Sequence, residues 1–294
     1  MTGMQLDDVS GCDVAAQACL RKAGFEKDKN LTVFLLPGLS GDVGEFSSLL
    51  SPPDASLHFV PIHYRHWSRL RSDANELDRL VADCVGQIES YGPRAKVFLL
   101  GYSFGAQMAC DVARAMIASG HRIGLLGLID APARPQVVTV PASTAERLHR
   151  LIRGIRRGET ADQLARFSAG ALFRPQAKRA RAVFKWLHGF GLFPRMLNRI
   201  DLNIQMRFHL ILLNEWLARM ASFDDRLLCP TTLFRGSSWP LGADADLGWT
   251  RYLGKLRVVT ISGDHGDVLQ PQNAEQIISE ITAIISKSDG VLPH

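Results

Sequence analysis

The stretch Lys96-Val-Phe-Leu-Leu-Gly101-Tyr-Ser103-Phe-Gly105 decides the fold of this chain. It joins an apolar run typical of a buried strand to a helical pattern over residues 104–118, with a Gly-x-Ser-x-Gly turn between them. So tight a strand-to-helix turn forces the serine into a strained backbone, and the two glycines remove side chains that would clash. We therefore expect Ser103 to project from the carboxyl edge of a sheet. The alternative is a helix-capping serine without chemistry.

Strands and helices alternate on both sides of this turn. The predicted strands are residues 31–36, 57–62, 96–100, 123–129, 231–234 and 257–261. The predicted helices around them are residues 73–91, 104–118 and 273–285. This alternation predicts an α/β fold with a mostly parallel central sheet flanked by helices. Pro61 cannot donate a ladder hydrogen bond, so its strand is expected at the sheet edge, or Pro61 at the strand end.

A segment without convincing strands interrupts this pattern. Residues 141–223 carry three apolar helical stripes, near residues 148–155, 183–187 and 208–220. They divide the core into residues 31–140 and 224–294. Fourteen Lys and Arg against four Asp and Glu fall between Glu146 and Arg207, whereas the whole chain has a net charge of +5. We interpret residues 141–223 as an Arg-rich helical lid over a pocket, and a solvated helical appendage is the alternative. Residues 1–30 are expected to form an N-terminal extension.

Composition excludes several classes of protein. The 294 residues are 46% apolar and 21% charged, an ordinary globular balance that rules out wholesale disorder. No apolar run reaches the roughly 18 residues of a membrane span, and the acidic start is unlike a secretory signal. Five scattered cysteines without a CxxC pair argue against a zinc site and for a cytoplasmic protein. The basic segment carries no nucleic-acid reader motif, so we expect no nucleic-acid partner.

A serine hydroxyl is a weak nucleophile, so it needs a base and a group that orients the base. His265 lies in the loop Gly263-Asp-His265, after the last predicted strand and before the last predicted helix. This loop belongs to the same carboxyl edge as Ser103. The other eight histidines fall on or after the second strand, in a turn, in the lid or at the C-terminus. His265 is therefore the predicted base.

Two places could supply the orienting acid. Asp130 ends the strand at residues 123–129 in the rigid context Ile-Asp-Ala-Pro. Asp244 and Asp246 follow the next strand, where many enzymes of this architecture keep their acid, but they fall in a small polar loop. We prefer Asp130 and keep Asp244 and Asp246 as alternatives. Asp264 and Asp267 flank His265 too closely to orient its ring.

A hole for a developing oxyanion needs two backbone N–H groups. One is expected from Phe104, the residue after the nucleophile. The other is expected from the loop Pro37-Gly-Leu39-Ser-Gly41 after the first strand. Proline has no N–H to give, so Leu39 is the candidate donor in this loop.

The residues quoted above resemble the thioesterase family of nonribosomal peptide and polyketide synthases, within the α/β-hydrolase fold. The resemblance runs from about Leu31 to Ile285 and rests on LLPGLSG, GYSFG, Asp130 and GDH, with Leu247-Gly-Trp249 as a further match. It implies that the acid follows the strand after the nucleophile strand, which supports Asp130. It also implies a helical lid where residues 141–223 fall.

The resemblance further implies a serine thioesterase that releases or edits acyl or peptidyl chains through an acyl-Ser103 intermediate. Its partner would be the phosphopantetheine arm of a carrier protein, and such carriers are typically acidic, which would suit the Arg-rich lid. No metal or cofactor is implied. A free-standing enzyme, without a carrier domain before it, is expected. The alternatives are a carboxylesterase or acyltransferase on free small esters, and a non-catalytic carrier-binding module.

Overall fold

A computed structural model describes residues 31–50, 57–65, 75–92, 96–134, 168–169, 172, 178–189, 194–220, 226–240 and 243–288. The predicted extension over residues 1–30 and the first lid stripe, near residues 148–155, lie outside these residues. The strands are β1 (Leu31–Leu36), β2 (Leu57–Pro61), β3 (Lys96–Tyr102), β4 (Arg122–Ile129), β5 (Leu227–Gly236) and β6 (Leu253–Ile261). The helices are η1 (Val43–Phe46), α2 (Glu76–Ser90), α3 (Phe104–Ala118), α6 (Lys178–Gly189), α7 (Pro194–Met220), η4 (Trp249–Arg251) and α8 (Pro271–Ser288).

The six strands form one sheet in the order β2-β1-β3-β4-β5-β6, and every neighbouring pair is parallel. This confirms the predicted α/β fold with a parallel central sheet. Because the strands are parallel, their carboxyl ends share one edge. The register there pairs Leu36 with Gly101, Tyr102 with Ile129 and Gly236 with Ile261. The loops after β1, β3, β4, β5 and β6 therefore meet at a single edge of the sheet.

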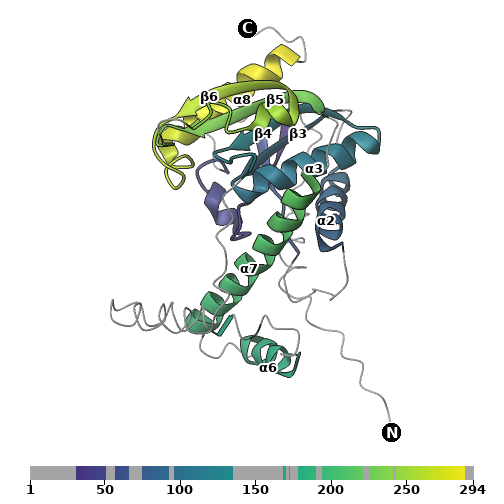
Figure 1. Ribbon diagram of the computed structural model, residues 1–294, viewed down its shortest axis with the longest axis vertical. Helices are drawn as coiled ribbons and strands as arrows, with labels where there is room; N and C mark the ends of the chain where they lie inside the picture. The colour runs from purple at the N-terminus through teal and green to yellow at the C-terminus, as the bar shows by residue number, and fades with distance from the viewer. Residues whose placement is uncertain are drawn as a thin grey trace.

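Helices cover both faces of the sheet (Figure 1). Strand residues alternate between the two faces: Leu99 packs into the core under α2 and α3, whereas Phe98 and Leu100 pack into the core under α8. The apolar stripe of α8, which includes Ile277, Ile281 and Ile285, is fully buried there. Burial on both faces explains why the central strands read as continuous apolar runs rather than as alternating ones.

Two prolines set strand ends and irregularities. β2 is an edge strand and Pro61 is its last residue, as the sequence predicted. β5 begins at Leu227, before the predicted start at residue 231, and its register with β6 shifts between Leu227 and Pro230. Pro230 has no N–H for the ladder, so the strand passes through it with an irregularity instead of ending there.

The segment before β5 contains the long helix α7, which runs from the sheet body to α6 (Figure 1). The sequence predicted only its second half, residues 208–220. One face of α7 is buried along its length, at steps of three to four residues: Leu197, Ile200, Ile204, Phe208, Leu212 and Trp216. At its C-terminal end Arg219 lies 2.7 Å from Asp78 of α2 and 3.6 Å from Asp111 of α3. α7 is therefore fixed to the helical layer beside α3.

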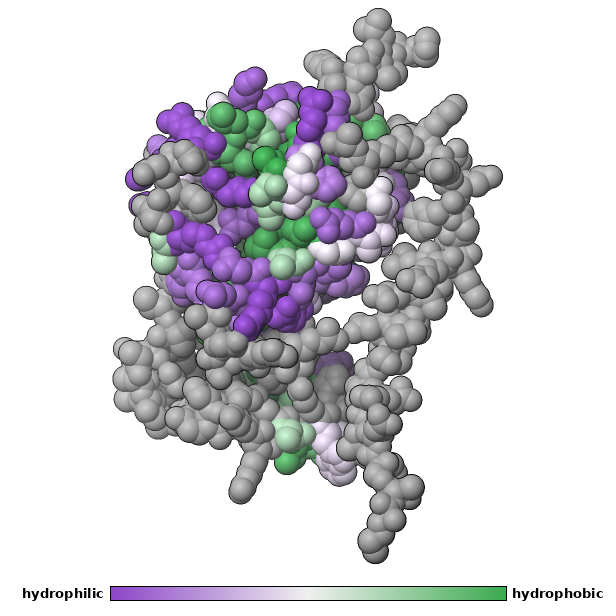
Figure 2. Space-filling model, turned by 90° about the vertical axis from the view of Figure 1, so that its right-hand side faces the viewer, coloured by the Kyte–Doolittle hydropathy of each residue, from purple (hydrophilic) through white to green (hydrophobic). Residues whose placement is uncertain are grey.

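Hydrophilic residues dominate the described surface in Figure 2, around a smaller band of apolar residues. Among the helices that the structure describes, none combines the length and apolar character needed to cross a membrane. On α6 and α7 several large apolar side chains are exposed, including Trp186 at 58% and Met196 at 47%.

Candidate active site

Ser103 occupies the sharp turn between β3 and α3. Its φ and ψ of 53° and −123° are a backbone conformation that residues other than glycine rarely adopt. The turn is fixed by Ser103 N–H donating to Ile129 O at 3.1 Å and Ser103 O accepting from Ala106 N–H at 2.9 Å. The Ser103 side chain makes no capping bond to α3. The structure therefore does not support the interpretation of Ser103 as a helix cap.

The two glycines of this turn have no room for a side chain. A Cβ on Gly101 would collide with the carbonyl oxygen of Gly105, and a Cβ on Gly105 would collide with the carbonyl oxygen of Leu36. The turn thus packs directly against the end of β1. This contact brings the loop after β1 next to Ser103.

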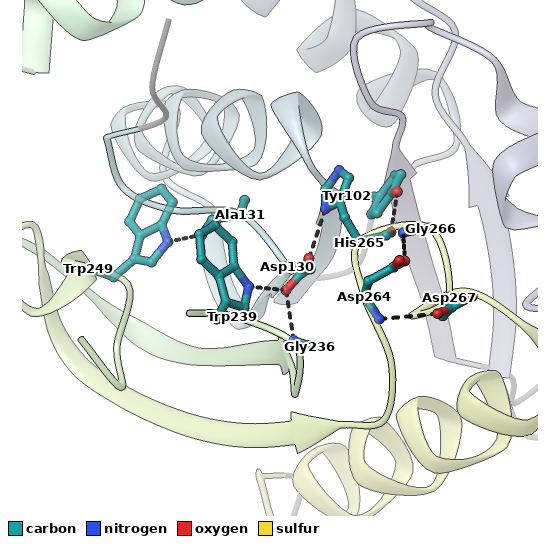
Figure 3. A network of polar contacts seen from close by, with 10 residues as sticks. All are labelled: Tyr102, Asp130, Ala131, Gly236, Trp239, Trp249, Asp264, His265, Gly266 and Asp267. Atoms are coloured by element: carbon teal, nitrogen blue, oxygen red, sulfur yellow. Dashed lines mark hydrogen bonds and ion pairs between the residues drawn. The ribbon is translucent and has the colours of Figure 1, made fainter. Parts of the chain in front are cut away.

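His265 and Asp130 meet at the same edge of the sheet (Figure 3). His265 Nδ1 lies 2.8 Å from Asp130 Oδ2, and the Asp130 residue is only 1% exposed. The other oxygen, Oδ1, accepts hydrogen bonds from Gly236 N–H at 2.7 Å and from Trp239 Nε1–H at 2.6 Å. Three groups therefore contact this carboxylate, one at Oδ2 and two at Oδ1.

These hydrogen bonds decide the charge of Asp130. Burial on its own raises the pKa of the carboxyl, but the bonds from His265, Trp239 and Gly236 outweigh burial and lower it below its ordinary value. Asp130 is therefore ionised at neutral pH and can only accept. His265 Nδ1 must carry the proton between the two groups, which leaves the Nε2 lone pair of a neutral imidazole free to act as a base.

The loop that carries His265 is fixed from two sides. The buried side chain of Asn273 donates from Nδ2 to Ser262 O and to Asp267 O, each at 2.8 Å. The Tyr102 ring stacks on the His265 imidazole, with centroids 4.9 Å apart, and its hydroxyl donates to His265 O at 2.7 Å. The imidazole thus has a defined orientation although half of its side chain is exposed.

Asp246, one of the two alternative acids, is engaged within its own turn. Asp246 accepts from Gly248 N–H at 3.1 Å and from the N–H and hydroxyl of Thr250 at 3.0 and 2.5 Å. Asp264 Oδ1 accepts from Gly266 N–H at 2.8 Å. Among the described carboxylates, Asp130 is the one that His265 Nδ1 contacts.

The Leu247-Gly-Trp249 stretch supports the residues that follow Asp130. Trp249 Nε1–H donates to Ala131 O at 2.6 Å, and Leu247 O accepts from Ala133 N–H at 2.9 Å. Leu247 and Gly248 both have positive φ, 49° and 81°, so the chain turns sharply to make these bonds. The Leu247-Gly-Trp249 match therefore stabilises the backbone of the residues that follow β4.

The loop after β1 is fixed by side chains from other elements. Tyr64 Oη donates to Pro37 O at 2.8 Å, and Glu45 Oε2 accepts from Gly38 N–H at 3.1 Å. His209 of α7 lies with Nδ1 2.7 Å from Leu39 O. The peptide groups on both sides of the Leu39 N–H are thus fixed.

All five predicted site residues line one cavity of about 520 Å³: Leu39, Ser103, Phe104, Asp130 and His265. Its other walls are largely apolar and include Pro132, Leu213 of α7 and Pro240. Within the described residues, no cluster of three or more His, Cys, Asp and Glu has the arrangement of a metal site. The arrangement can position a nucleophile, a base with its orienting acid, and two amide donors around one reacting carbonyl.

Sequence reasoning missed several residues that shape this cavity. Trp239 and Gly236 bind Asp130, and Tyr64 and His209 bind the loop after β1. Trp239 follows β5 closely, which is a weak signal for the carboxyl edge. His209 carried no signal, because it reads as one more histidine of a lid helix.

The chain is similar to known proteins in sequence and in fold. The sequence matches the family described as Thioesterase domain over residues 31–285. It is 34% identical over 101 residues to N-(5-amino-5-carboxypentanoyl)-L-cysteinyl-D-valine synthase of Penicillium rubens, a match that covers 34% of this chain and 3% of the synthase.

Two solved structures are similar in fold. A NocB thioesterase domain in covalent complex with a fluorophosphonate nocardicin G analogue aligns with a TM-score of 0.57 at 16% identity, over 89% of this chain and 96% of that one. ClbQ from the colibactin NRPS/PKS pathway aligns with a TM-score of 0.54 at 17% identity, over 90% of this chain and 100% of that one. At such identities the likeness shows a shared fold.

Proposed function

Because this chain belongs to the thioesterase domain family, we propose that it is a serine hydrolase that cleaves thioesters through an acyl-Ser103 intermediate. One observation carries the proposal. A buried, ionised Asp130 fixes His265 through Nδ1, and both line the same cavity as the strained Ser103 turn. A helix cap or a packing histidine would need none of this arrangement.

In the first half of the reaction, His265 Nε2 takes the proton from the Ser103 hydroxyl as the oxygen attacks the thioester carbonyl. Asp130 stabilises the imidazolium that forms. The N–H groups of Leu39 and Phe104 bind the oxyanion of the tetrahedral intermediate. When this intermediate collapses, the carbon–sulfur bond breaks and the thiolate receives the proton from His265.

In the second half, His265 removes a proton from water, or from an amine or hydroxyl of the acyl chain, as that group attacks the ester on Ser103. The same two amides bind the second oxyanion. The serine oxygen then leaves and takes the proton back from His265, which restores the free enzyme.

For the substrate, we propose an acyl or peptidyl chain held on the phosphopantetheine arm of a carrier protein. The similar proteins support this, because they include a peptide synthase and ClbQ of an NRPS/PKS pathway. The apolar cavity walls suit an acyl chain. Release of a finished chain and editing of a stalled one would use the same chemistry.

We further propose that residues 141–223 form a lid on a core made of residues 31–140 and 224–294. Leu213 of α7 lines the cavity, so this segment contributes to the wall of the site. Arg195 and Arg199 are exposed on α7, within the basic stretch between Glu146 and Arg207. They would attract an acidic carrier. Reversing both charges should slow turnover of the carrier-bound substrate and spare a small acyl-pantetheine thioester.

The proposed function is tested by comparing kcat/KM for three donors of one acyl group: the loaded carrier, acyl-pantetheine and a simple aryl ester. Ser103→Ala serves as the inactive control. The proposal expects the loaded carrier to be the best donor and the simple ester the poorest. Equal rates for all three donors would make the protein a general esterase. Carrier binding without turnover would make it a binding module.

A further inference from the structure

His209 connects α7 with both proposed oxyanion donors. Its Nδ1 lies 2.7 Å from the carbonyl oxygen of Leu39. Its ring stacks on the Phe104 ring, with centroids 5.4 Å apart and planes 17° apart. Leu39 lies in the loop after β1 and Phe104 is the first residue of α3, so the two are far apart in sequence. His209 is thus a single side chain in contact with both residues whose N–H groups must converge on one oxyanion.

The protonation state of His209 follows from its surroundings. The residue is fully buried, and burial lowers its pKa to about 4, although the bond to Leu39 O opposes that shift. The imidazole is therefore neutral near pH 7. Because a carbonyl oxygen can only accept, the ring proton sits on Nδ1 and is donated to Leu39 O. Nε2 is buried and has no hydrogen-bond partner among the residues that the structure describes.

The contact between α7 and the loop after β1 extends beyond this bond. A Cβ on Gly41 would collide with the side chain of Gln205, one turn before His209 on α7. Tyr64, which binds Pro37 O, packs edge-to-face against the His209 ring with centroids 5.2 Å apart. The loop is thus held between Tyr64 and α7, and a displacement of α7 would move the Leu39 carbonyl directly.

Packing alone does not explain a histidine at this position. A phenyl ring would fill the same aromatic contacts without burying an unpartnered nitrogen, which is a cost that native cores avoid. What the imidazole adds is the Nδ1–H bond to Leu39 O. That bond fixes the peptide group next to the Leu39 N–H.

We propose that His209 is a positioning residue that sets the geometry of the oxyanion hole and makes its assembly depend on the position of α7. The inference rests on the proposed function, in which the Leu39 and Phe104 amides bind the oxyanion. The lid helix then does more than cover the cavity. Any substrate or partner that shifts α7 changes the alignment of the oxyanion donors, and with it the rate of acyl transfer.

Two substitutions separate the effect of the hydrogen bond to Leu39 O from the effect of the aromatic packing of the ring. His209→Phe keeps the aromatic contacts and loses the donor to Leu39 O. His209→Asn loses the ring but places an amide N–H near the position of Nδ1. Ile281→Ala removes buried side-chain volume from α8, on the other face of the sheet, and serves as the control for a general loss of packing. Each variant is measured with acyl-pantetheine for kcat and KM, with thermal unfolding for stability, and with a boronic acid for affinity of a tetrahedral adduct.

Misplacing one oxyanion donor costs catalysis about tenfold to a hundredfold, and removing one costs more. His209→Phe should therefore lower kcat and boronic acid affinity by about that factor, with KM and melting temperature close to wild type. His209→Asn should recover a large part of kcat. Ile281→Ala should lower the melting temperature while kcat stays near wild type.

The outcomes distinguish this inference from the proposed function. Wild-type kcat in His209→Phe, with an active wild-type enzyme, overturns the role of His209 and leaves the serine mechanism intact. A loss of kcat in Ile281→Ala equal to that in His209→Phe would also overturn it, because a general loss of packing would then be the cause. An inactive wild type that forms no boronic acid adduct would instead overturn the proposed function.

Discussion

Asp130 Oδ2 faces His265 Nδ1 at 2.8 Å, while Asp130 Oδ1 is occupied by the two donors Gly236 N–H and Trp239 Nε1–H. The two oxygens of one buried carboxylate are thus not interchangeable. One is fixed by the protein frame and the other is reserved for the histidine.

This asymmetry makes Asp130→Asn a sharp test. In the variant the amide oxygen must stay with Gly236 and Trp239, so the amide NH₂ faces His265. The histidine then accepts at Nδ1 and carries its proton on Nε2, where it cannot act as a base. We expect kcat to fall about a thousandfold to ten-thousandfold, as for the equivalent change in serine proteases, with the fold retained.

The control for this change is Asp246→Asn. The Asp246 carboxylate binds within its own turn, so kcat should stay near that of the wild type at temperatures where both variants are folded. Steady-state kinetics beside circular dichroism spectra would check both variants. A larger loss in Asp246→Asn than in Asp130→Asn would assign the acid to Asp246.

Trp239→Phe should weaken the site more mildly. The change removes one of the hydrogen bonds that lower the pKa of Asp130, so that pKa should rise and the acid-side loss of activity should begin at a higher pH. We expect kcat at its optimum to fall about tenfold, because the carboxylate is held less firmly. Trp186→Phe, on an exposed tryptophan of α6, is the matched control. An unchanged pH–rate profile in Trp239→Phe would contradict the role of this bond.

Two glycines should respond in opposite ways to the same substitution. Gly101→Ala forces a Cβ into the backbone of Gly105, so the protein should fail to fold or lose more than about 3 kcal/mol of stability. Gly86→Ala on α2 meets nothing within 4 Å and should add about 0.5–1 kcal/mol. Urea denaturation followed by circular dichroism measures both. A well-folded Gly101→Ala variant would contradict the tight turn at Ser103.

Asp111 makes the free energy of unfolding of the protein depend on pH. Burial raises its pKa from 3.8 to about 6, against the lowering effects of Arg219 and Arg114. Between about pH 4 and pH 6 the folded state therefore binds more protons than the unfolded state, and this residue's contribution to stability is lost as pH rises through that window. Asp111→Asn mimics the protonated form. It should be more stable than wild type at pH 8, by on the order of 1–3 kcal/mol, and similar at pH 4.

The control here is Asp78→Asn, the more exposed partner of the same arginine, which should change stability by less than about 1 kcal/mol. The free energy of unfolding of the three proteins is measured across pH 4–8. An Asp111→Asn variant less stable than wild type at pH 8 would mean that the attraction to Arg219 outweighs the burial of the charge.

The fold could be predicted from the sequence because its main signals are local. Apolar runs bounded by glycine and proline identified β1, β3 and β4, and the Ser103 turn between β3 and α3 follows from two glycines. Errors occurred where tertiary contacts override local rules. β5 begins at Leu227, before the predicted start at residue 231, and α7 begins at Pro194, well before the predicted helix at residues 208–220.

The residues of the site also separate into those that the sequence predicted and those that it did not. Strand order alone predicted that Ser103, His265 and Asp130 would share an edge, and the structure places them around one cavity; their catalytic roles stay predictions. The groups that fix them could not be predicted. Trp239 and His209 contact residues more than a hundred positions away in the sequence, and Tyr64 contacts Pro37 across 27 positions from the loop after β2.

The central claim is that Ser103 carries the acyl group during turnover. Intact-mass spectrometry tests it most directly, with the protein mixed with acyl-loaded carrier and, separately, with acyl-pantetheine, beside Ser103→Ala. The account predicts a mass increase of one acyl group on the wild type only, formed faster from the carrier. An adduct of equal size on Ser103→Ala, or turnover in that variant, would contradict it.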